Sequence, residues 1–587
     1  MAGSSSAALS ASVSLVVLQV VSRLFSFGLN QLLLRSTSPR AFGVATIQLD
    51  TWIGTVLFFV REGIRGAVAR AAPVKNGDDG GRRRQTLLIP TLLSPGALLA
   101  CAAFYNYASP TPIPPQYPLT FLLYSVSILI ELVSEPAFLT TLASWQTLTT
   151  KRVKVEGIAL LVKAVTTLLV VQFVSERDAL VAFGVGQLAY SATVWAGLVA
   201  VAPAAPSPVS ALALKRTGSE AAYFDKAVLE TAWALTKQSV VKQMLTEGDK
   251  FAVGRFGSSA DMGGYAVALN YGSLIARVVF QPLEESSRLY FSSLAAASES
   301  TQNGDRKDPS RQRSPPLSAL ASCASYLRLV LLFQTHLALI FFLLAPCYTT
   351  PLLHLLLGPK WSLTSASPIL RAYAMSLPFL GLNGITEAFF QAVADPEWIQ
   401  RGAGWMVLCG GAFAGSVWVT AQAFKMGAVG LVLANCVNMF LRTAFSTLFI
   451  VQYFRKVLSA AEPQKGAIRD EKDDIGSDEE RLRHEARRSL NRRSWTPSLL
   501  TISTFVLGGY VCRRSEADWT AAVMAPLLGG TTAPFLNRRA ELYATGKHLG
   551  VGAAMGLLGL ASIALSHREE LCVVLSKRSS LSDKKKE

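Results

Sequence analysis

Charged side chains interrupt an otherwise apolar stretch of this sequence between Gly272 and Arg288. Within roughly three helical turns, the stretch holds Arg277, Gln281, Glu284, Glu285 and Arg288. A charged side chain at the centre of a transmembrane helix costs roughly 2.5 to 3.5 kcal/mol on insertion scales, so it needs an ion partner, a water-filled cavity or a polar ligand. Arginine can bind phosphate through two parallel N–H groups and keeps its charge when partly buried. The stretch therefore indicates either an ion network or a site for an anion.

Three further predicted helices carry polar residues three and four positions apart, which places those residues on one helical face. They are Gln19, Ser22, Arg23, Ser26 and Asn30 in helix 12–34, Gln48, Thr51, Thr55, Glu62 and Arg65 in helix 42–64, and Gln238, Lys242, Thr246 and Asp249 in helix 233–255. With the Gly272–Arg288 stretch, these faces predict a shared polar chamber in which arginines outnumber free carboxylates.

Other interpretations of these charges remain open. The polar faces could form hydrogen bonds between helices, with Arg61, Arg65 and Lys250 near helix ends reaching the headgroups. Glu284 and Arg288 are four residues apart and could neutralise each other. Pro282 removes a backbone hydrogen bond, so we expect a kink beside them. Single charges within other apolar segments are expected to form packing or gating pairs, namely Lys163, Arg371, Glu387 and Arg442.

Composition places the chain among membrane proteins with several spans. Of 587 residues, 51% are hydrophobic and 16% are charged, whereas soluble domains carry about 25% charged residues. The net charge of +17 lies mainly in loops, which is typical of membrane topology and does not require nucleic acid. The seven cysteines and five histidines show no ligand spacing, and no nucleophile stands beside a base. We therefore expect no enzyme activity, cofactor, metal or nucleotide.

Apolar segments separated by polar breaks predict an all-α polytopic fold with about 14 transmembrane helices. They lie near residues 12–34, 42–64, 86–105, 119–142, 156–174, 179–202, 233–255, 264–295, 319–346, 366–393, 402–424, 428–454, 496–512 and 548–566. Residues 513–547 could hold a re-entrant apolar piece, Ala521 to Leu528. Lys and Arg gather in the loops after the second, fourth, sixth, eighth and twelfth helices, which predicts cytosolic termini. The basic residues of 513–547 are the exception to this pattern.

The predicted helices divide into two lobes of six and a terminal pair. Residues 1–203 are expected to form the N-terminal lobe, 204–232 a cytosolic connection and 233–458 the C-terminal lobe. Residues 459–494 are rich in charge and predict a mobile or loosely helical cytosolic linker. Residues 495–587 would form the terminal helix pair and a cytosolic tail.

Several segments of the chain resemble the Rft family. They are Arg61-Glu-Gly-Ile-Arg65, Thr246-Glu-Gly-Asp-Lys250, the run from Gly272 to Glu285, Asn383-Gly-Ile-Thr-Glu-Ala-Phe389, and Gly427-Ala-Val-Gly-Leu followed by Ala434-Asn-Cys-Val-Asn438. The resemblance extends from about Ser22 to Phe454 and includes Leu34-Arg35 through Thr37-Ser-Pro39 and Phe42-Gly43. It implies an endoplasmic reticulum protein that moves dolichyl-pyrophosphate heptasaccharide to the lumenal leaflet for N-glycosylation. The implied fold is that of the multidrug/oligosaccharidyl-lipid/polysaccharide exporters.

These expectations assign roles to particular residues. The predicted substrate contacts are Arg23, Arg35, Arg61, Arg65, Lys242, Arg277, Gln281 and Arg288. The predicted gating or ion-pair residues are Glu62, Asp249, Lys250, Pro282, Glu284, Glu285, Glu387 and Arg442. Lys584 and Lys585 resemble a dilysine retrieval signal. Two alternative functions stay open: a non-transporting accessory protein of the same pathway, and a cation-coupled antiporter of the same fold.

Overall fold

A computed structural model describes most of the chain. The described residues are 28–71, 78–108, 114–143, 145–174, 178–212, 214, 223–300, 317–460, 474–489, 495–528 and 534–568. Every regular element within these ranges is a helix. The chain divides into two compact units, Met1–Ala266 with Leu356–Thr364 (unit 1) and Val267–Leu355 with Ser365–Glu587 (unit 2).

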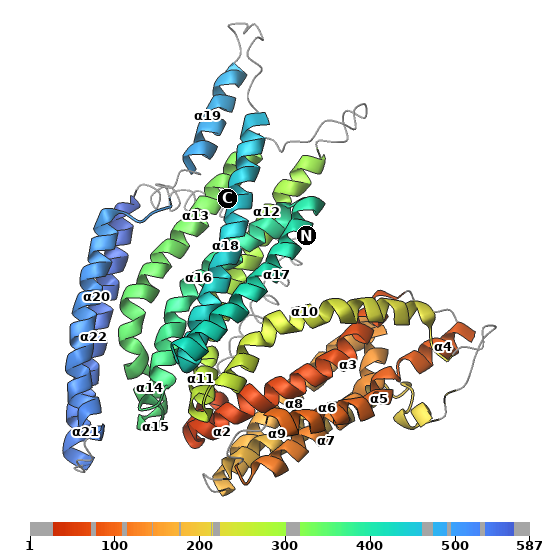
Figure 1. The fold of residues 1–587 in the computed structure, drawn as a ribbon. Coiled ribbons are helices and arrows are strands. Elements are labelled where there is room, and N and C mark those ends of the chain that lie inside the picture. The colour runs from red at the N-terminus through yellow and green to blue at the C-terminus, as the bar shows by residue number, and fades with distance from the viewer. Residues whose placement is uncertain are drawn as a thin grey trace, which may run out of the picture. The chain divides into compact units, whose positions relative to one another are not determined.

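Unit 1 is a bundle of long helices (Figure 1). After a helical segment at residues 28–36, its elements are α2 (Pro39–Gly43), η1 (Val44–Leu49), α3 (Asp50–Arg70), α4 (Asp78–Thr86), α5 (Ile89–Leu92), α6 (Ser94–Ala108), α7 (Tyr117–Ala143), α8 (Trp145–Phe173), α9 (Ala179–Val201), η2 (Pro208–Leu212) and α10 (Lys226–Phe256). The short α15 (Pro359–Ser362) joins this unit, since the buried Trp361 indole donates to the Leu34 carbonyl oxygen. The helix α11 (Ser259–Ile275) crosses the boundary between the units.

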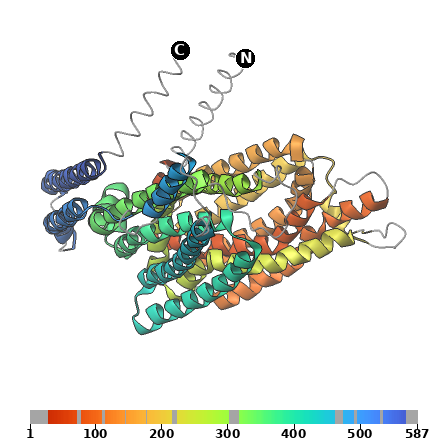
Figure 2. The same cartoon turned by 90° about the horizontal axis from the view of Figure 1, so that it is seen from above.

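Unit 2 contains a helical core and a terminal pair. Its elements are η3 (Ala276–Phe280), α12 (Gln281–Ser300), α13 (Leu317–Leu339), η5 (Ile340–Leu344), η6 (Ala345–Tyr348), α14 (Thr349–Leu357, whose last residues belong to unit 1), α16 (Ala366–Val393), α17 (Pro396–Trp418), η7 (Val419–Ala423), α18 (Gly427–Ala460), α19 (Asp474–Ser489), α20 (Leu499–Trp519), η9 (Thr520–Met524), α21 (Ala525–Leu528) and α22 (Pro534–Ser566). Its apolar core is rich in aromatic residues, among them Phe291, Phe389, Phe449 and Phe454. The pair α20 and α22 runs side by side in both views (Figures 1 and 2).

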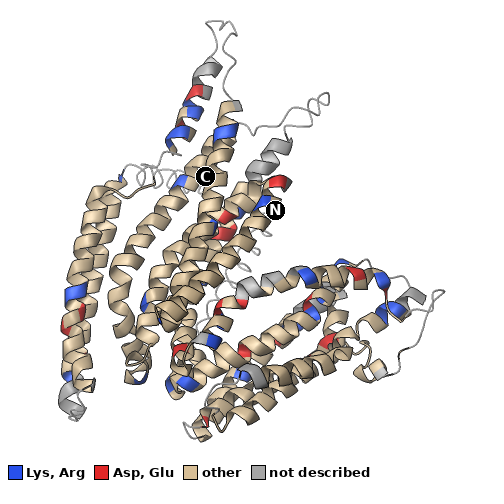
Figure 3. Ribbon diagram, viewed as in Figure 1, with Lys and Arg blue, Asp and Glu red and all other residues tan. Residues whose placement is uncertain are grey.

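Eight helical stretches are long and apolar enough to cross a membrane. They are Pro39–Arg70, Tyr117–Leu142, Lys151–Phe173, Ala179–Val201, Leu317–Leu357, Glu397–Ala423, Gly427–Ser459 and Arg539–Ser566. The predicted polytopic all-α class is therefore confirmed for the described residues. Four other long helical stretches, α10, α11 to α12, α16 and α20, are not among the eight. Figure 3 shows charged residues interspersed along mostly uncharged helices.

The predicted end of the thirteenth helix at residue 512 is wrong. The helix α20 continues without a break through η9 and α21 to Leu528, so Ala521 to Leu528 extends this helix and is not a separate re-entrant piece. Arg513 and Arg514 lie within α20, and Arg539 and Lys547 lie within α22. Their charges suggested a loop, but the two helices carry them. Lys547 of α22 lies 4.0 Å from Asp518 of α20, and the acidic residues Glu516 and Glu541 of the same helices pair with Arg371 and His354.

The charged linker, predicted as a mobile or loosely helical connection, contains the helix α19, which packs against unit 2. Leu482 and Ala486 of α19 contact the apolar core of unit 2, and Ala486 is 1% exposed. The Ser489 hydroxyl lies 3.3 Å from the Ser325 hydroxyl of α13. Polar residues cover the opposite face of α19, including the exposed Arg481, His484 and Arg488. Amphipathic spacing therefore outweighs the high charge in determining this segment.

Candidate functional site

Two arginines of α3 are paired with two glutamates of α7. Arg61 Nη1 donates to Glu131 Oε2 at 3.0 Å. Arg65 donates through Nε and Nη2 to the two carboxylate oxygens of Glu135, and its guanidinium carbon lies 3.6 Å from the centroid of the Phe138 ring. Both glutamates are buried, at 5% exposure for Glu131 and 1% for Glu135. Such bidentate, charge-assisted bonds offset part of the cost of burying the ions.

The Arg61–Glu131 pair extends into a continuous polar chain through α7, α8 and α9. The second carboxylate oxygen of Glu131 accepts from Gln187 Nε2 at 3.2 Å and from Ser191 Oγ at 3.1 Å. Lys163 Nζ donates to Gln187 Oε1 at 2.7 Å and to Asp50 Oδ1 at 3.2 Å. Asp50 also accepts from the Tyr124 hydroxyl at 3.1 Å. We call the residues Asp50, Arg61, Arg65, Tyr124, Glu131, Glu135, Lys163, Gln187 and Ser191 the N-terminal network.

A glycine on α3 allows α10 to approach closely beside this network. A Cβ atom at Gly63 would lie 2.0 Å from Thr236 Oγ1 and 2.6 Å from the Ala232 carbonyl oxygen. Gly63 is the central residue of the motif Arg61-Glu-Gly-Ile-Arg65, which resembles a segment of the Rft family. The motif therefore combines two cations that contact α7 with a small residue that contacts α10.

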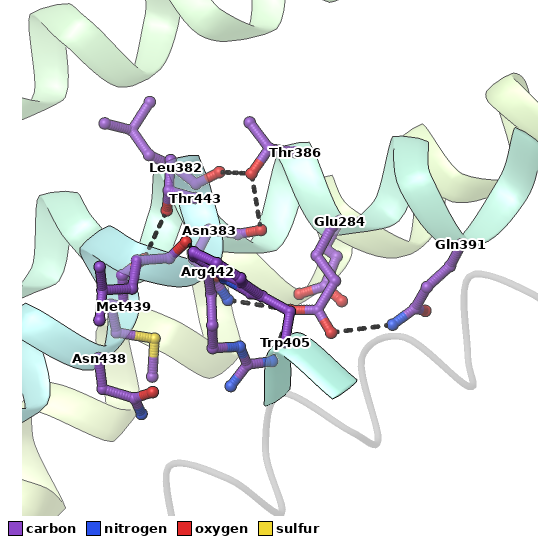
Figure 4. A network of polar contacts seen from close by, with 12 residues as sticks. Glu284, Leu382, Asn383, Thr386, Gln391, Trp405, Asn438, Met439, Arg442 and Thr443 are labelled. Carbon is purple, nitrogen blue, oxygen red and sulfur yellow. Dashed lines mark hydrogen bonds and ion pairs between the residues drawn. The ribbon is translucent and has the colours of Figure 1, made fainter. Parts of the chain in front are cut away.

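Unit 2 contains a second polar network, whose members Glu284, Asn383, Gln391 and Arg442 are drawn in Figure 4. Its centre is Glu387 of α16. Glu387 Oε2 accepts from Arg442 Nη2 of α18 at 2.6 Å and from Asn383 Nδ2 at 3.1 Å. Its other oxygen accepts from Gln391 Nε2 at 3.1 Å. Glu387 and Arg442 were both predicted as gating or ion-pair residues, and in the structure they are each other's partner.

The charges of α12 lie beside the same helix. Arg288 Nη2 donates to Glu284 Oε1 at 2.7 Å, as their spacing predicted. A Cβ at Gly384 of α16 would lie 2.9 Å from Glu284 Oε2, so this carboxylate lies close to the α16 backbone (Figure 4). Gln281 Nε2 donates to Glu285 Oε1 at 3.1 Å. We call Glu284, Arg288, Asn383, Glu387, Gln391 and Arg442 the C-terminal network.

Arg277 differs from the other arginines of these networks. It lies in η3, where the Gln281 N–H bonds to the Ala276 carbonyl oxygen, five residues back. The chain remains helical through Pro282, and this wider turn precedes the proline. The exposed Arg277 side chain bonds only to its own helix, through Nε to the Ser273 carbonyl at 3.1 Å and Nη2 to Ser273 Oγ at 2.8 Å. No carboxylate among the described residues pairs with it. Single π-helical turns are frequent at functional sites.

The remaining predicted site residues have diverse surroundings. Arg35 Nε donates to the Leu356 carbonyl oxygen at 2.5 Å. Asp249 accepts from the Tyr265 hydroxyl at 2.6 Å, and Lys250 pairs with Glu247 at 2.7 Å. Glu62 has no hydrogen bond or ion pair to another residue that the structure describes. Arg23, Lys584, Lys585 and the Lys242 side chain lie outside the described part of the chain.

Sequence reasoning missed the partners of Arg61 and Arg65. Glu131 and Glu135 stand one turn apart in the apolar segment 119–142, at the same spacing as the two arginines. That matching spacing was a usable signal for two parallel ion pairs. Asp50 was also missed, although Lys163 was expected to form a pair and does so with Asp50.

Comparisons with known proteins agree on one family and one fold. The family model described as Rft protein matches residues 6–577. The Man(5)GlcNAc(2)-PP-dolichol translocation protein RFT1 of Eremothecium gossypii is 32% identical over 477 residues, covering 75% of this chain and 82% of the relative. The protein of the same name from Saccharomyces cerevisiae is 29% identical over 490 residues, with 75% and 82% covered.

A solved structure is similar over almost the whole chain. It is the lipid II flippase MurJ in an inward closed conformation, with a TM-score of 0.52, 13% identity, and coverage of 94% of this chain and 100% of that chain. At this identity the likeness shows the fold alone.

Proposed function

The chain belongs to the Rft protein family, and from this premise we propose that it translocates Man(5)GlcNAc(2)-PP-dolichol from the cytosolic to the lumenal leaflet of the endoplasmic reticulum. The names of the curated relatives support this substrate. The likeness to a flippase fold agrees with movement of a lipid-linked sugar without chemical change. We propose that the translocator acts without enzymatic chemistry, nucleotide or cofactor.

The observation that carries the proposal is the environment of Arg277. Arg61, Arg65, Arg288 and Arg442 each contact a carboxylate, so a phosphate would have to compete with that partner. Among the residues that the structure describes, Arg277 forms hydrogen bonds only with Ser273. Its guanidinium can therefore turn to a pyrophosphate without breaking an ion pair, and two of its N–H groups can bind phosphate oxygens together. Among the predicted substrate contacts, we propose Arg277 as the principal one.

The finer organisation is also a proposal. We propose about 14 transmembrane helices, with the charged helices α10, α11 to α12, α16 and α20 crossing beside the eight apolar ones. The lobes would be residues 1–203 and 233–458, with both termini cytosolic, and transport would use alternating access. Polar helices of this kind suit a transporter, because charged side chains can face protein or water instead of lipid.

Reconstitution of the purified full-length protein tests the function. Liposomes carrying Man(5)GlcNAc(2)-PP-dolichol would be assayed for movement of the lipid between leaflets, with fluorescent phosphatidylcholine as a control for leakage and unspecific scrambling. The wild-type protein should accelerate movement of the glycolipid and leave phosphatidylcholine in place. If movement equals that in empty liposomes while the protein still restores N-glycosylation in cells, the accessory role replaces our proposal.

Two variants test the assignment of Arg277. Arg277→Gln should slow translocation about tenfold or more, since a charge-assisted hydrogen bond contributes roughly 1.5–3 kcal/mol. Arg288→Gln is the matched control on the same helix, because Arg288 is already neutralised by Glu284. If both variants slow translocation equally, or if neither does, Arg277 is not the principal phosphate contact.

A further inference from the structure

An open cavity of about 510 Å³ lies in unit 2 between α16 and the continuous helix formed by α20, η9 and α21. Arg371 of α16 lines one side. The other side is lined by residues of the continuous helix, including Arg513, Glu516, Ala517, Ala521 and Met524. None of these residues belongs to the N-terminal or the C-terminal network.

At Arg513 the cavity lies beside a helix that is apolar enough to cross a membrane. The helix α20 packs along α22, whose residues Arg539–Ser566 are long and apolar enough to cross a membrane. Arg513 lies between two contacts of α20 with α22. A Cβ atom added at Gly508 would lie 3.5 Å from Met555 Cβ, and Ser515 Oγ lies 2.9 Å from His548 Nδ1. Met555 lies in the uncharged part of α22, and His548 lies at the start of that part. Arg513 therefore stands beside a helix that is apolar enough to cross a membrane, where a charge needs a partner.

The charges that line the cavity leave one cation without a partner. Arg371 forms an ion pair with Glu516, which neutralises both. Arg513 is exposed and forms no hydrogen bond or ion pair with any residue that the structure describes. The cavity lining therefore carries a net charge of +1.

We propose that this cavity binds the headgroup phosphate of an anionic phospholipid, with Arg513 as its principal contact. A phosphodiester with a single negative charge matches the net positive charge of the lining. A pyrophosphate diester carries two negative charges and would leave one unbalanced. A guanidinium binds phosphate oxygens through two N–H groups at once.

The shape of the lining suits the rest of a phospholipid. Ala517 and Ala521 are one turn apart on the continuous helix, and Met524 follows them. Small side chains leave room for an acyl chain along the helix, and the flexible methionine can adapt to it. A lipid bound here would contact both α16 of the core and α20 of the terminal pair. It would then stabilise the attachment of α20 to the core, together with the Arg371–Glu516 pair.

Native mass spectrometry of the full-length protein in detergent tests the proposal. The protein would be titrated with phosphatidylinositol, phosphatidylcholine or inorganic phosphate. We expect phosphatidylinositol to be retained in preference to phosphatidylcholine, and inorganic phosphate not to displace it. Displacement by millimolar inorganic phosphate would overturn the lipid assignment in favour of a free-phosphate site, and equal retention of the two lipids would overturn the assignment of an anionic headgroup.

Paired variants of α20 locate the site. Arg513→Ala should weaken retention of phosphatidylinositol about tenfold, the equivalent of one charge-assisted hydrogen bond. Arg514→Ala is the matched control, because Arg514 is the adjacent exposed arginine and does not line the cavity. Equal retention by these two variants would overturn the proposal.

A second variant keeps the test valid if Arg513→Ala fails to fold. Ala521→Leu adds bulk to the cavity lining and leaves both arginines in place, so it should also reduce retention of the lipid. Unchanged retention in Ala521→Leu would show that the lipid lies elsewhere. Because the readout is lipid retention, its result does not depend on whether the protein translocates a glycolipid.

Discussion

Arg65 of α3 donates two hydrogen bonds to the carboxylate of Glu135 of α7, one helical turn beyond the contact of Arg61 with Glu131. Both pairs join residues 70 positions apart. Equal separations mean that α3 and α7 run in the same direction where they meet. In helices of opposite direction, the later arginine would lie beside the earlier glutamate. Parallel helices end on the same side of a membrane, which agrees with the basic loops predicted after the second and fourth helices.

The Arg65–Glu135 pair should be important for stability. Removing one partner of a buried pair leaves an uncompensated charge and costs roughly 3–5 kcal/mol. We expect Glu135→Ala to lower the free energy of unfolding by this amount, as measured by thermal or steric-trap unfolding in detergent micelles. Glu397→Ala, which breaks the exposed Arg401–Glu397 pair, should cost less than about 1 kcal/mol. Similar losses in the two variants would contradict the buried pair.

Neutralising both members of the Glu387–Arg442 pair should be less harmful than neutralising one. Arg442→Gln alone leaves Glu387 with only two amide donors, Asn383 and Gln391. We expect the single variant to unfold more easily than Glu387→Gln/Arg442→Gln, with a coupling of about 0.5–3 kcal/mol. Additive effects in this double-mutant cycle would show that the two side chains do not interact.

Two glycines of α3 should respond to alanine in opposite directions. Gly63→Ala would place a methyl group 2.0 Å from Thr236 Oγ1, and overpacking of this kind costs roughly 1–3 kcal/mol. Gly54 has nothing within 4 Å of its Cβ position, so Gly54→Ala should stabilise the helix by roughly 0.5–1 kcal/mol. Melting temperatures of the two variants check this prediction. A melting temperature that rises in Gly63→Ala would rule out the close approach of α10.

The helix α19 should detach when its buried face is altered. Ala486 is 1% exposed against the core of unit 2, so Ala486→Asp would bury an unpaired carboxylate there. We expect faster tryptic cleavage within residues 474–489, measured by limited proteolysis with mass spectrometry. Glu485→Asp is the control, since it keeps both the charge and the exposure of its position. Equal cleavage of both variants would show that α19 does not depend on this contact.

The helices followed from the sequence because each depends on local spacing. Every one of the predicted segments overlaps a helix of the described chain, and the Glu284–Arg288 contact follows from a separation of four residues. The cost of placing charge in lipid also predicted that Lys163, Arg371, Glu387 and Arg442 would have partners. The predicted end of the thirteenth helix at residue 512 was wrong because the basic residues after it, Arg513, Arg514, Arg538, Arg539 and Lys547, are typical of a loop, whereas they lie within α20 and α22.

The sequence by itself therefore determined a helical membrane protein of the Rft family whose intramembrane charges require compensation, since transfer costs and helical periodicity are properties of single segments. Only the tertiary structure decided which charges are compensated within the protein. The partner of Arg65 is on a helix 70 residues away, and no spacing rule selects one neighbouring helix over another. The packing of α3 against α7 leaves Arg61 and Arg65 neutralised, whereas Arg277 on η3 and Arg513 on α20 have no carboxylate partner in the described chain. Those two arginines are the ones that we propose bind phosphate.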